Sequence, residues 1–170
     1  MSDLKPIERR ILFELVKNPR RSDRELAKAL NVSQPTVTRR RAFIEREYID
    51  DYTAIPKWSK IGYNLFVITL VKIKADIASK EKYDIVRKKA LAWLSTQPDI
   101  LMSTGSRGGG VDSFMISIHK TYSDFDKFIH DYKYELGELI DDCHSIIVNL
   151  GGEEVTKHFT LRDWAKARLK

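Results

Sequence analysis

The sequence predicts an α+β chain, in which a three-helix unit precedes a β-α-β-β-α-β unit and a C-terminal helix. Two observations predict this class. The first third of the chain contains only short amphipathic helical patterns, and the remainder alternates strand-sized apolar runs with helical ones. Apolar residues make up 42% of the 170 residues and charged residues 32%, which is the composition of a folded chain. We expect four parts, over residues 1–56, 57–64 (a linker), 65–150 and 151–170.

Local signals mark the ends of each predicted helix in the first part. Pro6 suits the first turn of a helix, and Asn18-Pro19 ends that helix because a proline disfavours helical geometry in the preceding residue. Ser22-Asp23-Arg24-Glu25 has the form of a capping box that opens a second helix. Asn31 favours the left-handed conformation that ends this helix. The third helix is expected over about Gln34–Glu47, with Ser33 as its N-cap.

The remainder of the chain is expected to form one antiparallel sheet with helices on a single face. Ile49–Pro56 alternates partly, which predicts a short strand pair or wing ahead of the linker. The predicted strands are Leu65–Lys74, Ile100–Thr104, Ser113–His119 and Cys143–Leu150. The predicted helices are Ser79–Gln97, a helix capped at Ser123 that runs to Leu136, and a last helix over Thr160–Leu169. The order β-α-β-β-α-β is that of the ferredoxin-like split unit.

Charge and cysteine content narrow the class of protein. Residues 1–60 hold 14 basic and 9 acidic residues, so they carry +5 of the net charge of +6, an excess that suits a polyanionic partner. The single cysteine, Cys143, excludes a disulfide framework within the chain and favours a reducing cytoplasm. The longest apolar run, Leu65–Val71, is too short to span a membrane, so no membrane partner is expected.

The third predicted helix carries the candidate DNA-binding residues. A short helix, a tight turn and a second helix with threonine and arginine on its outer face form a helix-turn-helix pattern, and an α-helix fits the major groove of DNA. We expect Arg39 and Thr36 to read bases. The phosphate-holding residues are expected to be Ser33, Gln34, Thr38 and Arg40. Arg41 lies on the apolar face, so its stem should follow the edge of the core while its head reaches the DNA backbone or an acidic partner.

An arginine run is more often a solvated surface than a binding site. Here Arg39-Arg40-Arg41 lies in a capped helix-turn-helix, and no acidic residue occurs between Ser33 and Ile44. This context favours DNA binding.

The helix-turn-helix segment Ser22–Ile49, the following Tyr52–Pro56 (YTAIP) and the β-α-β-β-α-β remainder together resemble the leucine-responsive/asparagine-synthase-C (Lrp/AsnC) family of transcription regulators. The resemblance implies a winged helix-turn-helix and a second domain that dimerises through its sheets and assembles further to tetramers or octamers. It also implies that a small-molecule effector such as an amino acid binds between subunits. The family usually has a glycine at the end of the recognition helix, and this sequence lacks it.

The glycine-rich stretch before the predicted third strand has two interpretations. Gly105 and Gly110 have the spacing of a phosphate-binding loop, but Val111-Asp112 replaces the required Lys-Ser/Thr pair and a strand follows, so that class is excluded. One remaining interpretation is a flexible hairpin connection. The other is the mobile lip of a ligand site, with Gly105, Arg107, Gly109, Gly110 and Asp112 as its candidate residues.

No catalytic or metal-binding pattern is evident, so we expect no enzyme activity and no cofactor. The four histidines lack metal-ligand spacing, and Cys143 and His144 point to opposite faces of a strand. The sequence therefore predicts a sequence-specific DNA-binding transcription regulator. One alternative, from resemblance in fold, is a subunit of a sirohaem (tetrapyrrole) decarboxylase, which His119 or His144 could serve. A second is an architectural protein that binds DNA without sequence specificity.

Overall fold

The computed structural model describes residues 4–75, 80–152 and 157–169. It contains two compact units. Unit 1 combines residues 1–55 with residues 157–170, and unit 2 comprises residues 56–156. The predicted C-terminal part, residues 151–170, thus contributes its last helix to the N-terminal unit.

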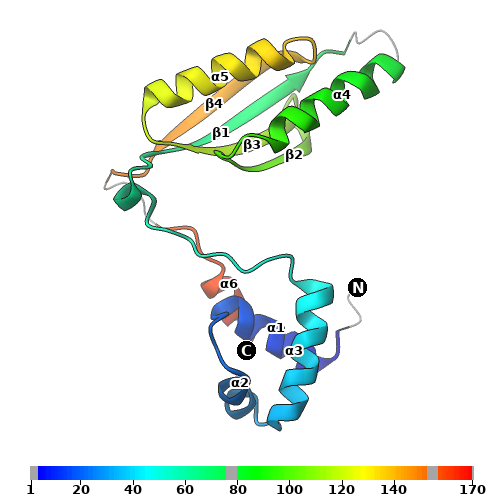
Figure 1. Cartoon of the computed structure of the whole chain (residues 1–170), viewed down its shortest axis with the longest axis vertical. Coiled ribbons are helices and arrows are strands. Elements are labelled where there is room, and N and C mark those ends of the chain that lie inside the picture. Colours follow the sequence, from blue (N-terminus) through cyan, green and yellow to red (C-terminus); the bar gives the residue numbers. More distant parts are fainter. Residues whose placement is uncertain (1–3, 76–79, 153–156, 170) are drawn as a thin grey trace. The chain divides into compact units, whose positions relative to one another are not determined.

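Unit 1 is built on three helices whose ends follow the local signals in the sequence (Figure 1). They are α1 (Pro6–Lys17), α2 (Asp23–Leu30) and α3 (Gln34–Tyr48). The capping box at the start of α2 is formed, because the Ser22 hydroxyl accepts from the Glu25 N–H while the Glu25 carboxylate accepts from the Ser22 N–H. Asn31 has φ 55° and ψ 50°, the predicted left-handed C-cap.

Small apolar faces from all three helices make the core of unit 1. Its fully buried side chains are Ile11, Leu15, Leu26, Val37 and Ile44. Val37 and Ile44 lie two turns apart on α3, so one face of that helix is buried and the opposite face is left for solvent.

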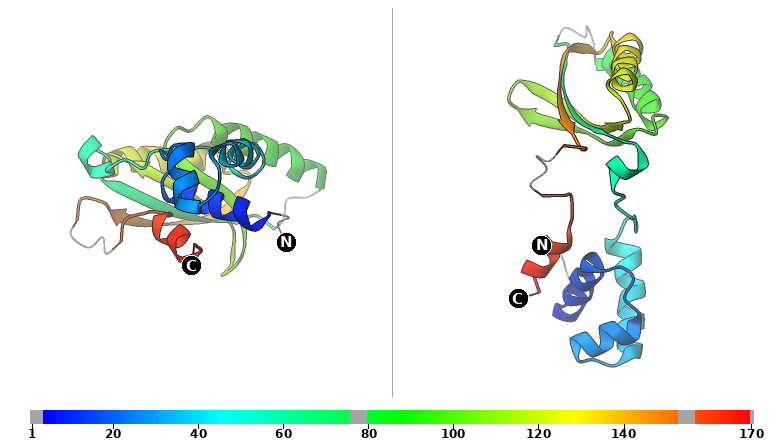
Figure 2. Two further views of the ribbon diagram at one scale, coloured as in Figure 1. Left: turned by 90° about the horizontal axis from the view of Figure 1, so that it is seen from below. Right: turned by 90° about the vertical axis from the view of Figure 1, so that its left-hand side faces the viewer.

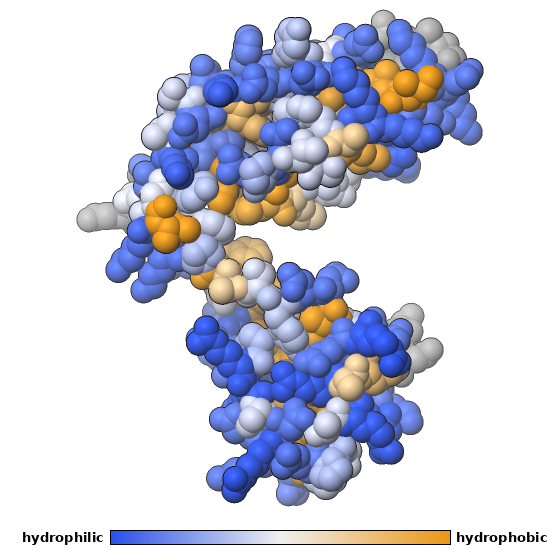
Figure 3. All heavy atoms as spheres, viewed as in Figure 1, coloured by the Kyte–Doolittle hydropathy of each residue, from blue (hydrophilic) through white to orange (hydrophobic). Residues whose placement is uncertain are grey.

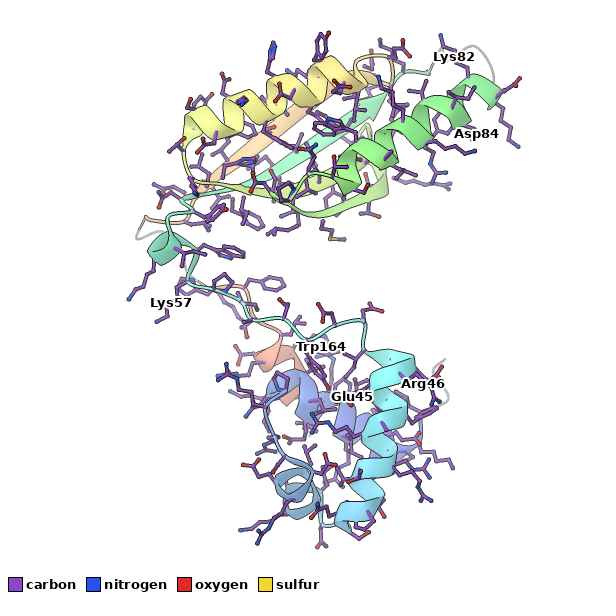
Figure 4. The ribbon with its side chains drawn as sticks, viewed as in Figure 1. Glu45, Arg46, Lys57, Lys82, Asp84 and Trp164 are labelled. Atoms are coloured by element: carbon purple, nitrogen blue, oxygen red, sulfur yellow. The ribbon has the colours of Figure 1, made fainter. Side chains whose placement is uncertain are left out.

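A short helix near the C-terminus, α6 (Arg162–Ala167), packs against α1. The Trp164 ring meets the Phe13 ring edge-on at 5.4 Å between centroids, and Ala165 is fully buried (Figure 4). This placement answers a question that the sequence left open. The last helix covers its own subunit, but it covers the helical unit rather than the sheet.

The strand pair predicted for Ile49–Pro56 is not formed. These residues have no regular secondary structure, and Tyr52 and Ile55 are exposed. A strand needs a partner for its backbone N–H and C=O groups, and none of the strands that the structure describes pairs with this segment. The linker that follows contains a single turn of 3-10 helix, η1 (Trp58–Ile61), which Gly62 ends at φ 89°.

Unit 2 is a four-stranded antiparallel sheet in the order β2-β3-β1-β4. The strands are β1 (Leu65–Ile73), β2 (Ile100–Gly108), β3 (Val111–His119) and β4 (Ile140–Asn149). Helices α4 (Lys80–Ser95) and α5 (Tyr122–Leu136) lie on one face of the sheet (Figure 2, right). This is the predicted ferredoxin-like arrangement.

Three local predictions for unit 2 are wrong in detail. β2 extends four residues beyond Thr104 and β4 begins three residues before Cys143, because pairing with a neighbouring strand recruits residues whose own pattern is weak. Helix α5 is capped by Thr121 and Asp124, which form a capping box whose N-cap lies two residues before the predicted cap at Ser123.

The core of unit 2 lies between the sheet and its helices. Its buried residues include Val71 and Met115 from the sheet and Ala90, Tyr132 and Leu136 from the helices. The opposite face of the sheet carries no helix and is strongly apolar. Cross-strand pairing groups on it Phe66, Ile68, Leu70, Met102, Phe114, Ile116, Ile146 and Val148, and we call this set the outer sheet face. Hydrophobic residues remain visible at the surface of this unit (orange in Figure 3).

Candidate nucleic-acid interface

The N-terminal turn of α3 is largely open to solvent. Ser33 and Gln34 are exposed, and Thr36 is half-buried with its hydroxyl 2.8 Å from the Ser33 hydroxyl. Ser33 makes no side-chain cap, and the backbone N–H groups of Gln34 and Thr36 have no acceptor in the described part of the chain. Free N–H groups at a helix N-terminus attract phosphate.

Arg39 is the one arginine of the predicted triplet whose guanidinium is left for a ligand. It is exposed, and no hydrogen bond or ion pair joins it to any of the residues that the structure describes. It lies one turn after Pro35, on the face of α3 opposite the buried Val37 and Ile44. A free guanidinium can form two parallel hydrogen bonds to a guanine edge.

Arg40 has a partner within the domain that its sequence context does not predict, and its contact with phosphate stays a prediction. Its guanidinium is bonded at 2.6 Å to the Glu8 carboxylate on α1, and that carboxylate is only 4% exposed. The other Glu8 oxygen accepts from the Lys5 backbone N–H and so closes the N-terminus of α1. Arg40 therefore ties α3 to α1 and compensates a buried charge.

Arg41 and Thr38 both bind Asp23 at the start of α2. The Thr38 hydroxyl donates to one Asp23 oxygen at 2.6 Å, and Arg41 donates to the other at 3.1 Å. Arg41 also binds Glu45 at 2.7 Å and the Arg21 backbone carbonyl at 2.8 Å. The hydrogen bond from Thr38, together with the Arg41 guanidinium, lowers the pKa of Asp23 despite partial burial. The acidic partner expected for Arg41 thus lies within its own domain.

These partners divide the predicted residues into two groups. Four project outward from the start of α3 with free hydrogen-bonding capacity: Ser33, Gln34, Thr36 and Arg39. The other three, Thr38, Arg40 and Arg41, hold α3 against α1 and α2. Sequence reasoning missed the partners Glu8 and Asp23. Glu8 did leave a signal, because it shares a helical face with Ile11 and Leu15, and an acid on an apolar face needs a buried partner.

The second candidate site, at the glycine-rich stretch, is a tight hairpin. Gly108 pairs with Val111, and Gly109 and Gly110 form the two-residue turn with φ of 61° and 74°. Positive φ at both central positions is the condition for a type I′ turn, which glycine meets without strain. Gly105 and Arg107 are exposed on β2, and one Asp112 oxygen accepts from the Ile73 N–H at 2.9 Å. The geometry accounts for the hairpin interpretation, and a ligand at this loop stays a prediction.

The histidine and cysteine candidates are dispersed. His119 is buried at the end of β3, whereas His144 is exposed on β4, 2.9 Å from Asp142. Cys143 packs against the helix-covered core, and burial raises the pKa of its thiol. Within the described residues, no three histidine, cysteine, aspartate or glutamate side chains are grouped as metal ligands.

Comparison with known protein families decides what the three helices are. Residues 6–42, which span α1, α2 and the N-terminal part of α3, match the family model of the AsnC-type helix-turn-helix domain. Residues 6–42 of unit 1 are therefore similar to AsnC-type helix-turn-helix domains. Comparison with curated protein sequences returns no match.

Solved structures extend this likeness to the whole chain. A transcriptional regulator from Neisseria meningitidis, solved as an L-Met complex, superposes with a TM-score of 0.74 at 21% identity over 95% of this chain and 99% of that one. AsnC of E. coli gives a TM-score of 0.69 at 19% identity over 93% and 99% of the two chains. LrpC of B. subtilis gives 0.66 at 22% identity over 92% and 100%. The AsnC-type domain is therefore joined to a second unit in the fold of AsnC/Lrp transcriptional regulators.

Proposed function

We propose that this chain is a sequence-specific DNA-binding transcription regulator of the Lrp/AsnC kind. The observation that carries the proposal is the exposed start of α3, where Arg39 and two unpaired backbone N–H groups project from an AsnC-type helix-turn-helix. Arg39 and Thr36 read base edges in the major groove. Ser33, Gln34 and the helix N-terminus hold phosphates.

The arginines that face inward support this assignment. The guanidinium groups of Arg40 and Arg41 form ion pairs with Glu8, Asp23 and Glu45. These ion pairs fix the orientation of α3 and therefore the direction in which Arg39 projects. A recognition helix that rigid contacts hold in place loses less conformational entropy when it binds DNA, so the free energy of binding is more favourable.

The proposed partners are double-stranded DNA and further copies of the chain. The outer sheet face exposes Met102 and Ile146, and a contiguous apolar face of this kind marks an interaction surface. A homodimer that buries this face would present two recognition helices to successive major grooves, about 34 Å apart on a pseudo-palindromic site. We further propose that these dimers assemble to tetramers or octamers.

Unit 2 is proposed to bind a small-molecule effector, and the likeness to a regulator solved with L-Met supports this.

None of the helices in the described part of the chain is long and apolar enough to cross a membrane. We propose a cytoplasmic regulator without catalytic activity.

Selection from a pool of random DNA duplexes tests the proposal. The purified full-length chain is mixed with the pool at fixed salt, and the retained duplexes are sequenced. Sequence-specific recognition predicts an enriched motif with two related half-sites. If retained and unselected duplexes have the same sequence composition, the chain is an architectural binder and the proposal is wrong.

Absorbance of the same preparation tests the enzymatic alternative. A regulator without a tetrapyrrole shows no Soret band. A preparation that retains such a band would contradict the proposed function.

A further inference from the structure

Tyr52 lies in the segment that follows α3, and its side chain contacts that helix. Residues 50–55 have no regular secondary structure and are exposed. The Tyr52 hydroxyl donates to the Oε1 atom of Glu45 at 2.9 Å, and Glu45 lies on the C-terminal half of α3 (Figure 4). Among the residues that the structure describes, this is the one hydrogen bond that joins residues 50–55 to a helix. Tyr52 therefore attaches an otherwise open segment to α3.

The hydroxyl of Tyr52 is shielded from water, although the residue as a whole is 43% exposed. Partial burial, together with the hydrogen bond to the Glu45 carboxylate, raises the pKa of Tyr52 to about 12. The phenol is therefore protonated near pH 7 and donates to the carboxylate. Such a hydrogen bond to an ionised acceptor is stronger than one between neutral groups.

Glu45 connects Tyr52 to Arg41, because one carboxylate oxygen accepts from both. The Arg41 Nε–H donates to the same Oε1 atom at 2.7 Å. An ion pair between residues four apart on a helix surface is weak on its own, since holding two long side chains in one geometry costs entropy. The Tyr52 hydroxyl already holds Glu45 in place, so less entropy is lost when Arg41 binds it. Tyr52 thus strengthens the Arg41–Glu45 pair.

Arg41 extends these contacts to α2. Its guanidinium donates to the Asp23 carboxylate at 3.1 Å, and Asp23 is the first residue of α2. The other Asp23 oxygen accepts from the Thr38 hydroxyl at 2.6 Å. The contacts therefore run from the segment after α3, across that helix, to the start of α2. We call the five residues Tyr52, Glu45, Arg41, Asp23 and Thr38 the Tyr52 network, and all five belong to unit 1.

We propose that Tyr52 is a positioning residue for DNA recognition, which holds α3 against α2 through Glu45 and Arg41. A displacement of residues 50–55 that withdraws the hydroxyl from Glu45 loosens α3 on α2 and weakens sequence-specific binding. The path of this segment thereby sets how α3 presents its exposed start to DNA. The inference rests on the proposed function and adds a means of regulating it, because the segment acts on α3 without touching the bases.

Amide hydrogen exchange of the full-length protein without DNA tests whether the network reaches α2. Tyr52→Phe keeps the ring and removes only the hydroxyl, and it is expected to accelerate exchange in α2 about two- to tenfold, the factor that corresponds to one hydrogen bond. A hydroxyl with only a local role would alter exchange near residue 52 and leave α2 unchanged. Unchanged exchange in α2 overturns the proposal.

Tyr48→Phe is the matched control for this experiment. Tyr48 is an exposed tyrosine in the last turn of α3, and its hydroxyl has no hydrogen-bond partner in residues 4–75, 80–152 and 157–169. The substitution keeps the contact of its ring with Phe43. Exchange in α2 should equal that of the wild type, and an acceleration as large as in Tyr52→Phe would contradict the proposal.

DNA affinity tests whether this effect reaches recognition. Tyr52→Phe is expected to bind the duplex selected by the wild-type chain about two- to tenfold more weakly, and to bind a random duplex as the wild type does, because the phosphate-holding groups are intact. A hydroxyl that merely stabilised the folded chain would leave both affinities unchanged under conditions in which the variant is folded. Wild-type affinity of Tyr52→Phe for the selected duplex overturns the proposal.

A double-mutant cycle tests whether Tyr52 acts through Glu45. Glu45→Ala removes the shared acceptor, so adding Tyr52→Phe to it should cause no further loss of affinity for the selected duplex. If Tyr52→Phe causes the same loss with and without Glu45, it acts by another route and the proposal is wrong.

These outcomes distinguish failure of the inference from failure of the proposed function. If the chain selects no DNA motif, the proposed function fails and the DNA part of the inference fails with it, whereas hydrogen exchange still decides whether the network holds α3 against α2. If a motif is selected but Tyr52→Phe binds it like the wild type, the proposed function stands and the inference fails.

Discussion

The three consecutive arginines of α3 contact different groups although their sequence context is nearly the same. Arg39 has no hydrogen-bond or ion-pair partner among residues 4–75, 80–152 and 157–169, whereas Arg40 binds the buried Glu8 and Arg41 binds Asp23 and Glu45. Their directions follow from the helix, because successive side chains are about 100° apart and only every third or fourth residue shares a face. Substitutions of neighbouring arginines should therefore have separate effects on stability and on binding.

Arg40→Ala is expected to lower the free energy of unfolding of unit 1 by about 1–3 kcal/mol, because it leaves the buried Glu8 carboxylate without its partner. Arg39→Ala, the matched control, should change it by less than about 0.5 kcal/mol. Urea unfolding followed by helical circular dichroism measures both. Equal losses in the two variants would show that the Glu8 ion pair does not support the fold.

His119 predicts how stability depends on pH. Burial lowers its folded-state pKa from the ordinary 6.5, so below pH 6.5 the unfolded chain binds a proton that the folded chain does not. The stability contributed by the neutral imidazole is complete above pH 6.5 and is lost as the pH falls below it. Urea unfolding at a series of pH values should show this loss, and His119→Gln should reduce it. If the free energy of unfolding of His119→Gln falls with pH as steeply as that of the wild type, other groups cause the pH dependence.

At the scale of elements, α6 belongs to the helix-turn-helix unit. Its Trp164 ring meets Phe13 of α1 while remaining 46% exposed, and the Arg168 guanidinium lies 4.5 Å from the indole centroid. Unit 1 is thus assembled from both ends of the described chain, and the residues of unit 2 lie between them in the sequence. The stability of α1 should depend on residues about 150 positions away in the sequence.

Trp164→Ala is expected to destabilise unit 1 by about 1–3 kcal/mol, because it removes an aromatic pair and uncovers Phe13. Amide hydrogen exchange should accelerate in α1 and stay unchanged in β1. Phe159→Ala is a suitable control, since Phe159 is exposed and makes no ring contact within the described residues. If exchange in α1 is unchanged in Trp164→Ala, α6 does not stabilise the domain.

Elements whose signals are local could be predicted from the sequence, and contacts between distant residues could not. The Ser22–Glu25 capping box, the Asn31 turn and the succession of strands and helices along unit 2 all follow from short patterns. By contrast, the Arg40–Glu8 ion pair joins residues 32 positions apart, and no local rule selects Glu8. The Ile49–Pro56 segment shows the converse, because its pattern favours a strand but no strand pairs with it in the part of the chain that the structure describes.

At the scale of the whole molecule, the outer sheet face predicts self-association. Ile146, which is 53% exposed on β4, pairs across the strands with Ile68 of β1 near the middle of this face. Its apolar neighbours remain in water unless a second copy covers them.

Ile146→Lys is expected to shift the protein from dimer or larger species toward monomer, because a charge would be buried in an apolar interface. Ile85→Lys changes an isoleucine on α4 that is 63% exposed, and it should leave the assembly unchanged. Sedimentation velocity distinguishes the two. A wild-type monomer, or identical assembly of both variants, would show that the outer sheet face is not the interface.

Titration of DNA against Arg39→Ala tests the central claim, that the exposed start of α3 reads sequence. Affinity is measured for a duplex that carries the motif selected by the wild-type chain and for a random duplex, both at the same salt concentration. Arg46→Ala is the matched control, because it removes an exposed positive charge from the far end of the same helix (Figure 4). We predict that Arg39→Ala lowers affinity for the selected duplex by about 1–3 kcal/mol and leaves affinity for the random duplex nearly unchanged. If Arg39→Ala still distinguishes the selected duplex from the random duplex as well as the wild type does, the claim that Arg39 reads sequence is contradicted.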